Sequence, residues 1–186
     1  ANDGITNNSI ITVGEKSVGI YGMAVDNNGT ISTGNGGTGI YSAGGNVNLT
    51  AGSTINVSGD KAVAVYANGN GQTINANNGA MLTIGDTSFG FINEGTGNTV
   101  LSNIASQNLS NDSVYIFSSD VTGTVVNNTT LNSLGSYNYG IYSAGSATNN
   151  ANINFGTGLG NVGVYSTHGG TITNSAVITV GGSYID

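Results

Sequence analysis

The sequence lacks cysteine, proline and tryptophan, and it contains very few charged residues. Among 186 residues there are two basic and nine acidic side chains, so charged residues make up 6% of the chain and the formal net charge is −7. Two cations are too few to neutralise a phosphate backbone or to dock on an anionic membrane, which excludes nucleic-acid partners and electrostatic membrane binding. Without cysteine the chain has no disulfide framework and no thiolate metal site. It also has no apolar run long enough for a helix that inserts into a bilayer.

Glycine and β-branched residues dominate what is present. The chain has 32 glycines, and 37% of its residues are hydrophobic, which is more apolar content than a disordered chain carries. Short alternating stretches, such as 10–13, 46–49, 54–57 and 177–180, are separated by Gly/Asn turns. This pattern predicts an all-β protein.

A four-residue strand recurs along the chain at a nearly constant interval. Its seven copies are 18–21, 38–41, 63–66, 89–92, 114–117, 139–142 and 162–165. Their last residues lie 20 to 26 positions apart, and two further short strands follow each copy. Three strands and three turns in about 24 residues predict a right-handed parallel β-helix, or β-solenoid, of seven to eight coils. We expect residues 1–186 to form one such segment.

Strand alternation predicts which side chains of the recurring strand face the interior. Because successive residues face opposite sides, the apolar first and third positions should fill the tube, and the second (usually Gly) and fourth (usually Tyr) should face outward. The chain begins and ends within a coil, which leads us to expect a piece of a longer rod. Open coils of this kind would be able to stack end to end.

The repeat resembles the passenger domains of type V autotransporters, the secreted β-helices of Gram-negative bacteria. The resemblance rests on Gly-Ile-Tyr-Ser at 39–42 and 140–143, together with Gly-Thr-Ile and Ile-Thr-Val-Gly strands. Within that family the chain looks most like the long Gly/Asn-rich passengers of fusobacterial surface adhesins. The resemblance implies display at the outer-membrane surface, secretion through a barrel, and adhesion to host or bacterial partners. It transfers no functional residues, because it holds only at coil-forming positions.

The side chains offer little for catalysis. Polysaccharide lyases built on β-helices use Arg or Lys as the base, but this chain has no Arg, and Lys16 and Lys61 fall two coils apart. Glycoside hydrolases need two carboxylates about 5 to 9.5 Å apart, and no Asp-Asp pair occurs. The single histidine, His168, lies in a Gly-rich turn. We therefore expect no catalytic residue and no enzyme activity.

Two outward columns are the candidate sites. The first is aromatic, and its candidate ligand-binding residues are Tyr21, Tyr41, Tyr66, Tyr142 and Tyr165, with Ile92 and Phe117 between them. Stacked rings fix coil register even without a ligand, but an exposed aromatic patch is also typical of a contact surface.

The second column is acidic and contains Asp60, Asp86 and Asp112 at one edge of consecutive coils. Like charges at coil spacing repel one another unless the turns splay or a cation bridges them. Ca²⁺, which prefers oxygen ligands, is the only cofactor that this column suggests. The Gly/Asp-rich nonapeptide of Ca²⁺-binding β-rolls is absent.

These observations favour a non-enzymatic, adhesive or structural module at the bacterial cell surface, with a cell-surface glycan or protein as its partner. A passive stalk that spaces a distal domain is the first alternative, and a carbohydrate-active enzyme is the second. An ice-binding solenoid requires a regular outward Thr-x-Thr ladder, whereas Thr12, Thr30, Thr54, Thr83 and Thr179 do not share one coil position.

Overall fold

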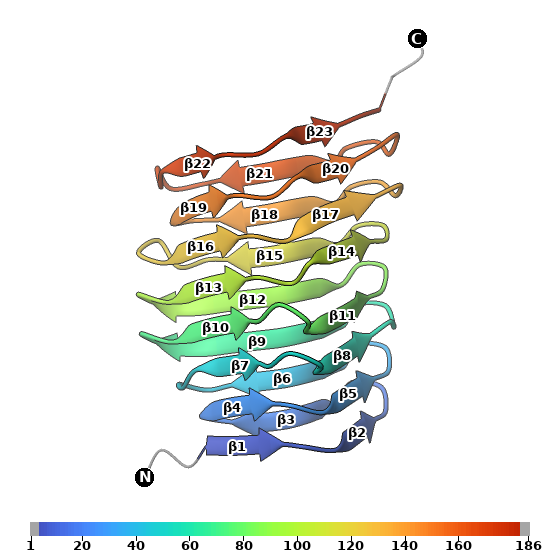
Figure 1. Ribbon diagram of the computed structural model, residues 1–186, viewed down its shortest axis with the longest axis vertical. Helices are drawn as coiled ribbons and strands as arrows, with labels where there is room; N and C mark the ends of the chain where they lie inside the picture. Colours follow the sequence, from blue (N-terminus) through green and yellow to red (C-terminus); the bar gives the residue numbers. More distant parts are fainter. Residues whose placement is uncertain (1–3, 183–186) are drawn as a thin grey trace.

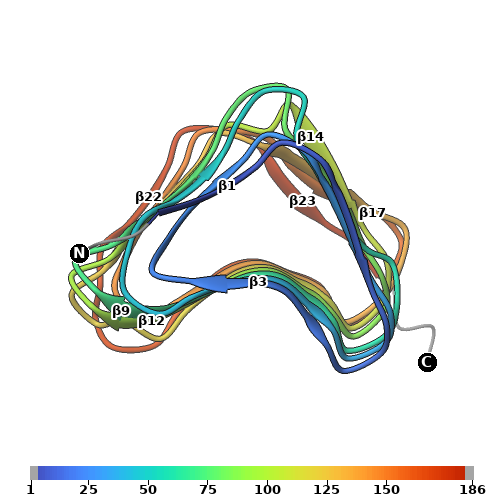
Figure 2. The same ribbon diagram turned by 90° about the horizontal axis from the view of Figure 1, so that it is seen from below.

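The chain folds into a β-solenoid in which successive coils stack along one axis. A computed structural model describes residues 4–182, and all regular elements in that range are strands. The coils rise from the N-terminal to the C-terminal end (Figure 1), and the cross-section is a triangle with one indented side (Figure 2). Seven three-strand coils are followed by two strands of an eighth, and every ladder is parallel. The predicted right-handed parallel β-helix is confirmed.

Each side of the triangle is a stack of equivalent strands. Sheet 1 comprises β1 (Gly4–Asn7), β4 (Ala24–Asn27), β7 (Val47–Leu49), β10 (Thr73–Ala76), β13 (Thr99–Ser102), β16 (Thr124–Asn127), β19 (Ser146–Asn149) and β22 (Ile172–Asn174). Sheet 3 comprises β3 (Val18–Gly22), β6 (Thr38–Ser42), β9 (Val63–Asn70), β12 (Phe89–Thr96), β15 (Val114–Ser118), β18 (Tyr139–Ser143) and β21 (Val162–Ser166).

The side between them consists of two separate sheets. Sheet 2a comprises β2 (Ile10–Val13), β5 (Thr30–Thr33), β8 (Thr54–Val57) and β11 (Met81–Ile84). Sheet 2b comprises β14 (Ser106–Leu109), β17 (Thr130–Ser133), β20 (Ile153–Phe155) and β23 (Ile178–Val180). No ladder joins β11 to β14 within the described residues. The connection that precedes β11 (77–80) is one residue longer than the one that precedes β14 (103–105).

The register of sheet 3 follows the repeat read from the sequence. Ile20 pairs with Ile40, which pairs with Val65, and the same column continues through Phe91, Ile116, Ile141 and Val164. These side chains form the interior together with Ile, Val and Leu from the other sheets. Burying a branched side chain of this size stabilises the fold by roughly 1.5–3 kcal/mol, so each coil adds its own part of one continuous core.

Asparagines form hydrogen-bonded ladders between coils. Inside the tube, the Nδ2 of Asn127 donates to Asn149 and that of Asn149 donates to Asn174, each at 2.8 Å. On the outside, Asn150 donates to Asn128 at 2.9 Å, and Asn128 donates to Asn103 at 2.7 Å. The buried amides of Asn127 and Asn149 therefore have partners, which removes most of the cost of their desolvation.

The expected alternation is correct at two positions of the recurring strand and wrong at the other two. The third position is buried and the fourth faces outward, as predicted. The second position, however, faces inward: a Cβ on Gly39 would lie 2.8 Å from the Ile55 methyl group and 2.6 Å from the Ala64 carbonyl oxygen. The first position faces outward, and Val18 is 42% exposed.

The reason for this difference is a bend in the strand. The ladder pairs residues 18, 20 and 21 with 38, 40 and 41 but skips Gly19 and Gly39. At this point the side of the triangle turns inward (Figure 2), so two successive residues face the interior. Glycine suits the inner position because little room is left there.

Candidate functional site

The outward column on sheet 3 is a stack of aromatic rings. The centroids of Tyr21 and Tyr41 are 5.1 Å apart, and those of Tyr41 and Tyr66 are 4.9 Å apart, with interplanar angles of 17° and 10°. Further along, Phe117 stacks on Tyr142 at 5.0 Å, and Tyr142 lies 5.1 Å from Tyr165. The ring spacing follows the strand spacing of about 4.8 Å. Ile92 separates the two stacks.

The inward bend brings a second column beside the first. The ring of Tyr139, at a first position, meets Tyr142 edge-on at 6.0 Å and Tyr165 at 6.2 Å. In the same way Phe89 meets Phe117 at 6.1 Å. The other first positions are mostly Val, so the two columns form a largely apolar surface across seven coils, with Thr38 as its polar member and Ile92 buried between the two stacks. We call this surface the aromatic strip, and its members are Val18, Tyr21, Thr38, Tyr41, Val63, Tyr66, Phe89, Ile92, Val114, Phe117, Tyr139, Tyr142, Val162 and Tyr165.

Polar contacts on the strip are few and lie near its centre. Tyr66 donates its hydroxyl hydrogen to Glu94, and the Nδ2 of Asn68 donates to the hydroxyl of Tyr41 at 3.2 Å. Partial burial, together with the hydrogen bond and negative charge of Glu94, raises the pKa of Tyr66 above its usual value. Tyr66 therefore keeps its proton throughout the physiological pH range.

The rings are accessible to a partner. Tyr21 is 68% exposed and Tyr165 is 45% exposed, while the rings between them are half-buried because they stack on each other. A flat set of uncharged rings can contact sugar rings or apolar side chains, and apolar patches of this extent mark interaction sites on soluble proteins.

The acidic column has a different arrangement. Asp60 and Asp86 occupy the same place in consecutive turns, but Asp112 lies one residue further on, at the position of Lys61 and Thr87, where φ is positive. The Oδ1 of Asp86 accepts the backbone N–H of Asn111 at 2.9 Å, a bond that ties two coils together. Within residues 4–182, no three His, Cys, Asp or Glu side chains lie close enough to hold a metal ion.

The remaining titratable side chains named from the sequence lie apart. Lys16 and Lys61 are in turns two coils from each other. His168 is exposed, and its Nδ1 shares a 2.8 Å hydrogen bond with the hydroxyl of Thr167. The structure does not bring these groups together with one another.

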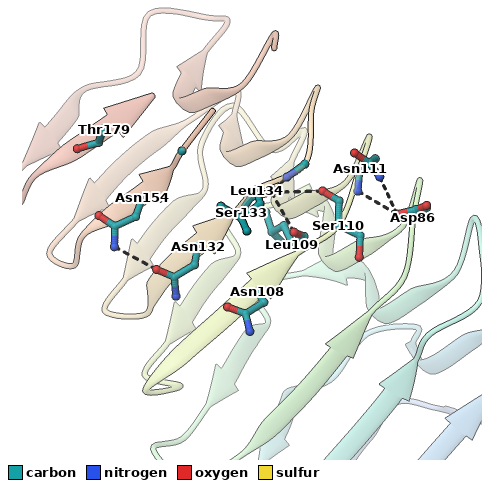
Figure 3. Close-up of a pocket in the computed structure, with 12 residues that line it drawn as sticks. Asp86, Asn108, Leu109, Ser110, Asn111, Asn132, Ser133, Leu134, Asn154 and Thr179 are labelled. Atoms are coloured by element: carbon teal, nitrogen blue, oxygen red, sulfur yellow. Dashed lines mark hydrogen bonds between the residues drawn. The ribbon is translucent and has the colours of Figure 1, made fainter. Parts of the chain in front are cut away.

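Sequence reasoning missed a concave site on sheet 2b. Asn108, Asn132 and Asn154 occupy matching positions of β14, β17 and β20, and Figure 3 shows them in a row on one side of a pocket. The pocket has a volume of about 950 Å³, and the turn residues Leu134 and Asn111 line its other side. We call it the amide groove. The feature of the sequence that could have indicated this site is the length of the turns that follow the three strands. These turns grow from one coil to the next: 110–113 after β14, 134–138 after β17 and 156–161 after β20.

Comparison of the chain with protein-family models, with curated proteins and with solved structures finds no match. In residues 4–182 there is also no helix that is long and apolar enough to cross a membrane.

Proposed function

We propose that the chain is a non-enzymatic adhesive segment of a bacterial surface protein, and that its aromatic strip contacts a glycan or protein on another cell. The observation that carries the proposal is the strip itself: two neighbouring columns on seven coils of sheet 3, in which two aromatic stacks lie on either side of Ile92. The resemblance to autotransporter passengers supports the proposed location at the outer membrane and exposure to other cells.

Energetic considerations support a contact role in addition to a structural one. Cross-strand aromatic pairs contribute only about 0.2–1 kcal/mol each, and stacking alone does not require the first-position column to be apolar as well. Val18 is 42% exposed on this surface. An exposed apolar side chain does not contribute the hydrophobic stabilisation that burial would give. A partner that covered the strip would bury these side chains, and that stabilisation would then favour binding.

Binding of the 186-residue chain to arrays of glycans and cell-surface proteins tests the proposal. A Tyr41→Ser, Tyr142→Ser double variant removes the centre of each stack. We expect it to lose at least about tenfold in affinity for any partner that the wild type binds, because central aromatics dominate interface energetics. Tyr137→Ser is the matched control, since Tyr137 is 56% exposed in a turn outside the strip. Equal affinity of the double variant and the control, or no partner on either array, would contradict the proposal.

The runner-up function is a passive stalk, which the regularity of the coils favours. A stalk works equally well with one coil fewer, whereas a contact surface loses part of its area. Deletion of one coil, residues 114–138, therefore separates the two functions when the partner binding of the deletion variant is measured.

A further inference from the structure

We propose that the amide groove on sheet 2b is a binding site for an uncharged oligosaccharide. The groove lies on a different side of the triangle from the aromatic strip, so the inference does not rest on the proposed function.

The floor of the groove has hydrogen-bonding groups without protein partners. The Nδ2 of Asn154 donates to the Oδ1 of Asn132 at 3.1 Å. Among the described residues, the Nδ2 of Asn132, the Oδ1 of Asn154 and both polar atoms of Asn108 make no hydrogen bond. This differs from the turn and interior ladders, in which Asn side chains bond to each other along the rod. Asn108 and Asn154 are exposed, so these atoms are open to a ligand.

The chemistry of these atoms matches hydroxyl groups. A carboxamide presents both a donor and an acceptor, and a sugar hydroxyl can serve as either. The three amides lie at strand spacing, about 4.8 Å from one to the next. Asn108 offers both a donor and an acceptor, Asn132 offers its Nδ2, and Asn154 offers its Oδ1. An elongated ligand along the rod axis would meet all three.

Charge in the groove is consistent with a neutral ligand. Among the residues that the structure describes, the only ionisable one that lines the groove is Asp86, and the Oδ1 of its carboxylate already accepts the N–H of Asn111. No Lys or His lines the groove to attract an anion. A carboxylated or sulfated sugar would approach Asp86 without a compensating cation.

The wall of the groove supplies apolar contact. Leu134 is 85% exposed and extends from the turn after β17, opposite the amide row (Figure 3). A pyranose ring has an apolar C–H face as well as polar edges, so a leucine on one side and amides on the other suit it. A volume of about 950 Å³ is also within the range of pockets that hold small ligands.

A peptide fits this arrangement less well. In an extended peptide, side chains on one face recur at roughly 6.6–6.8 Å, which does not match the amide spacing of about one strand. A sugar chain has hydroxyls along its whole length, and it can therefore meet each amide without a fixed register.

Titration of the full chain with cellohexaose and maltohexaose, followed by calorimetry or NMR, tests the inference. We expect at least one of these neutral probes to bind, and Asn108→Ala and Asn132→Ala each to weaken it roughly 2- to 10-fold, as the loss of a hydrogen bond predicts. Ser32→Ala is the matched control, because Ser32 occupies the same strand position on sheet 2a. The side chain of Asn108 makes no hydrogen bond within residues 4–182, so we expect Asn108→Ala to keep the fold even if Asn132→Ala does not.

Several outcomes would overturn the inference. These are no binding of either hexasaccharide at millimolar concentration, tighter binding of oligogalacturonate, or equal binding of a Ser-Gly hexapeptide. Binding that is unchanged in the Asn variants but lost in Tyr142→Ser would move the sugar to the aromatic strip, and the proposed function would then stand while this inference fails. Loss in the Asn variants together with no effect of Tyr142→Ser would support the groove alone.

Discussion

At the scale of single residues, the interior of sheet 3 depends on glycines where the strand bends. The inner second position is Gly in five of the seven copies, and Ala64 and Tyr115 occupy it in the other two. Tyr115 is completely buried, with its hydroxyl 2.6 Å from the Oγ of Ser102 and 3.3 Å from that of Thr129. It fills the interior in the coil in which sheet 2b begins.

A side chain added at the bend should destabilise the fold. We expect Gly39→Ala to lower the free energy of unfolding by about 1–3 kcal/mol, because the new Cβ would overlap the Ala64 oxygen and the Ile55 methyl group. Gly14→Ala is the control, since a Cβ there meets nothing within 4 Å. Urea unfolding of both variants measures the difference, and equal midpoints would show that the bend has spare room.

Alkaline pH should also weaken the fold through Tyr115. Burial raises its pKa to about 12 from 10.0, against the opposing effect of its hydrogen bonds with Ser102 and Thr129. Because the pKa is higher in the folded state, the folded chain retains the proton longer than the unfolded chain does. The contribution of this tyrosine is therefore complete below pH 10 and is lost between about pH 10 and 12.

The matched variant for this effect is Tyr115→Phe. We expect the wild type to lose roughly 2–3 kcal/mol more than this variant across that range. Unfolding in urea at a series of pH values measures the loss. Tyr66, whose pKa is also raised, is present in both proteins and cancels in the comparison. Parallel pH profiles would contradict the assignment to Tyr115.

At the scale of elements, the interruption between sheets 2a and 2b is the main departure from regular stacking. Strands β11 and β14 each end a four-stranded sheet, whereas sheets 1 and 3 continue through the same coils. The break also places the start of the amide groove at β14.

Hydrogen exchange should reveal this interruption. We expect the backbone amides of β11 and β14 to exchange faster than those of β8 and β17, which have a ladder partner on both sides. A strand with one free edge opens at a lower free energy than a strand inside a sheet. Exchange followed by mass spectrometry of the folded chain measures it, and uniform protection across the four strands would be inconsistent with an open edge.

At the scale of the whole molecule, each coil contacts only its neighbours, so the rod should tolerate removal of one unit. Deleting 114–138 joins residue 113 to 139 and puts Tyr139 in the place of Val114, its ladder partner. We expect a folded rod that is shorter by about 4.8 Å, the spacing of one strand.

Small-angle scattering and circular dichroism of the deletion variant test this expectation. The deletion removes Phe117 from the aromatic strip and β17 from the amide groove. Reduced partner binding by a folded variant would support a contact surface, and full binding would support the stalk. A variant without β-structure would show that coils are not interchangeable.

Much of this architecture could be predicted from periodicity. The coil repeat and the order of the aromatic column follow from the spacing of the Ile and Tyr positions, and the ladder pairs them as expected. The ladder is regular because one-residue slips would expose the core face of a strand. By contrast, strict alternation assumes a straight strand, and for that reason it placed Val18 and Gly19 on the wrong sides.

The sequence by itself determined the fold class, the coil repeat and the near absence of ionisable chemistry, because these depend on composition and local spacing. Only the tertiary structure decided the inward bend of sheet 3, the split of sheet 2 and the amide groove. The bend lies within the strand, where the ladder skips the second position and two successive residues face the interior. The split and the groove depend on how neighbouring coils pair and on how their turns stack in space. Asn108 and Leu134 line one pocket because β14 pairs with β17, where Asn132 lies opposite Asn108, and no motif in the chain marks them.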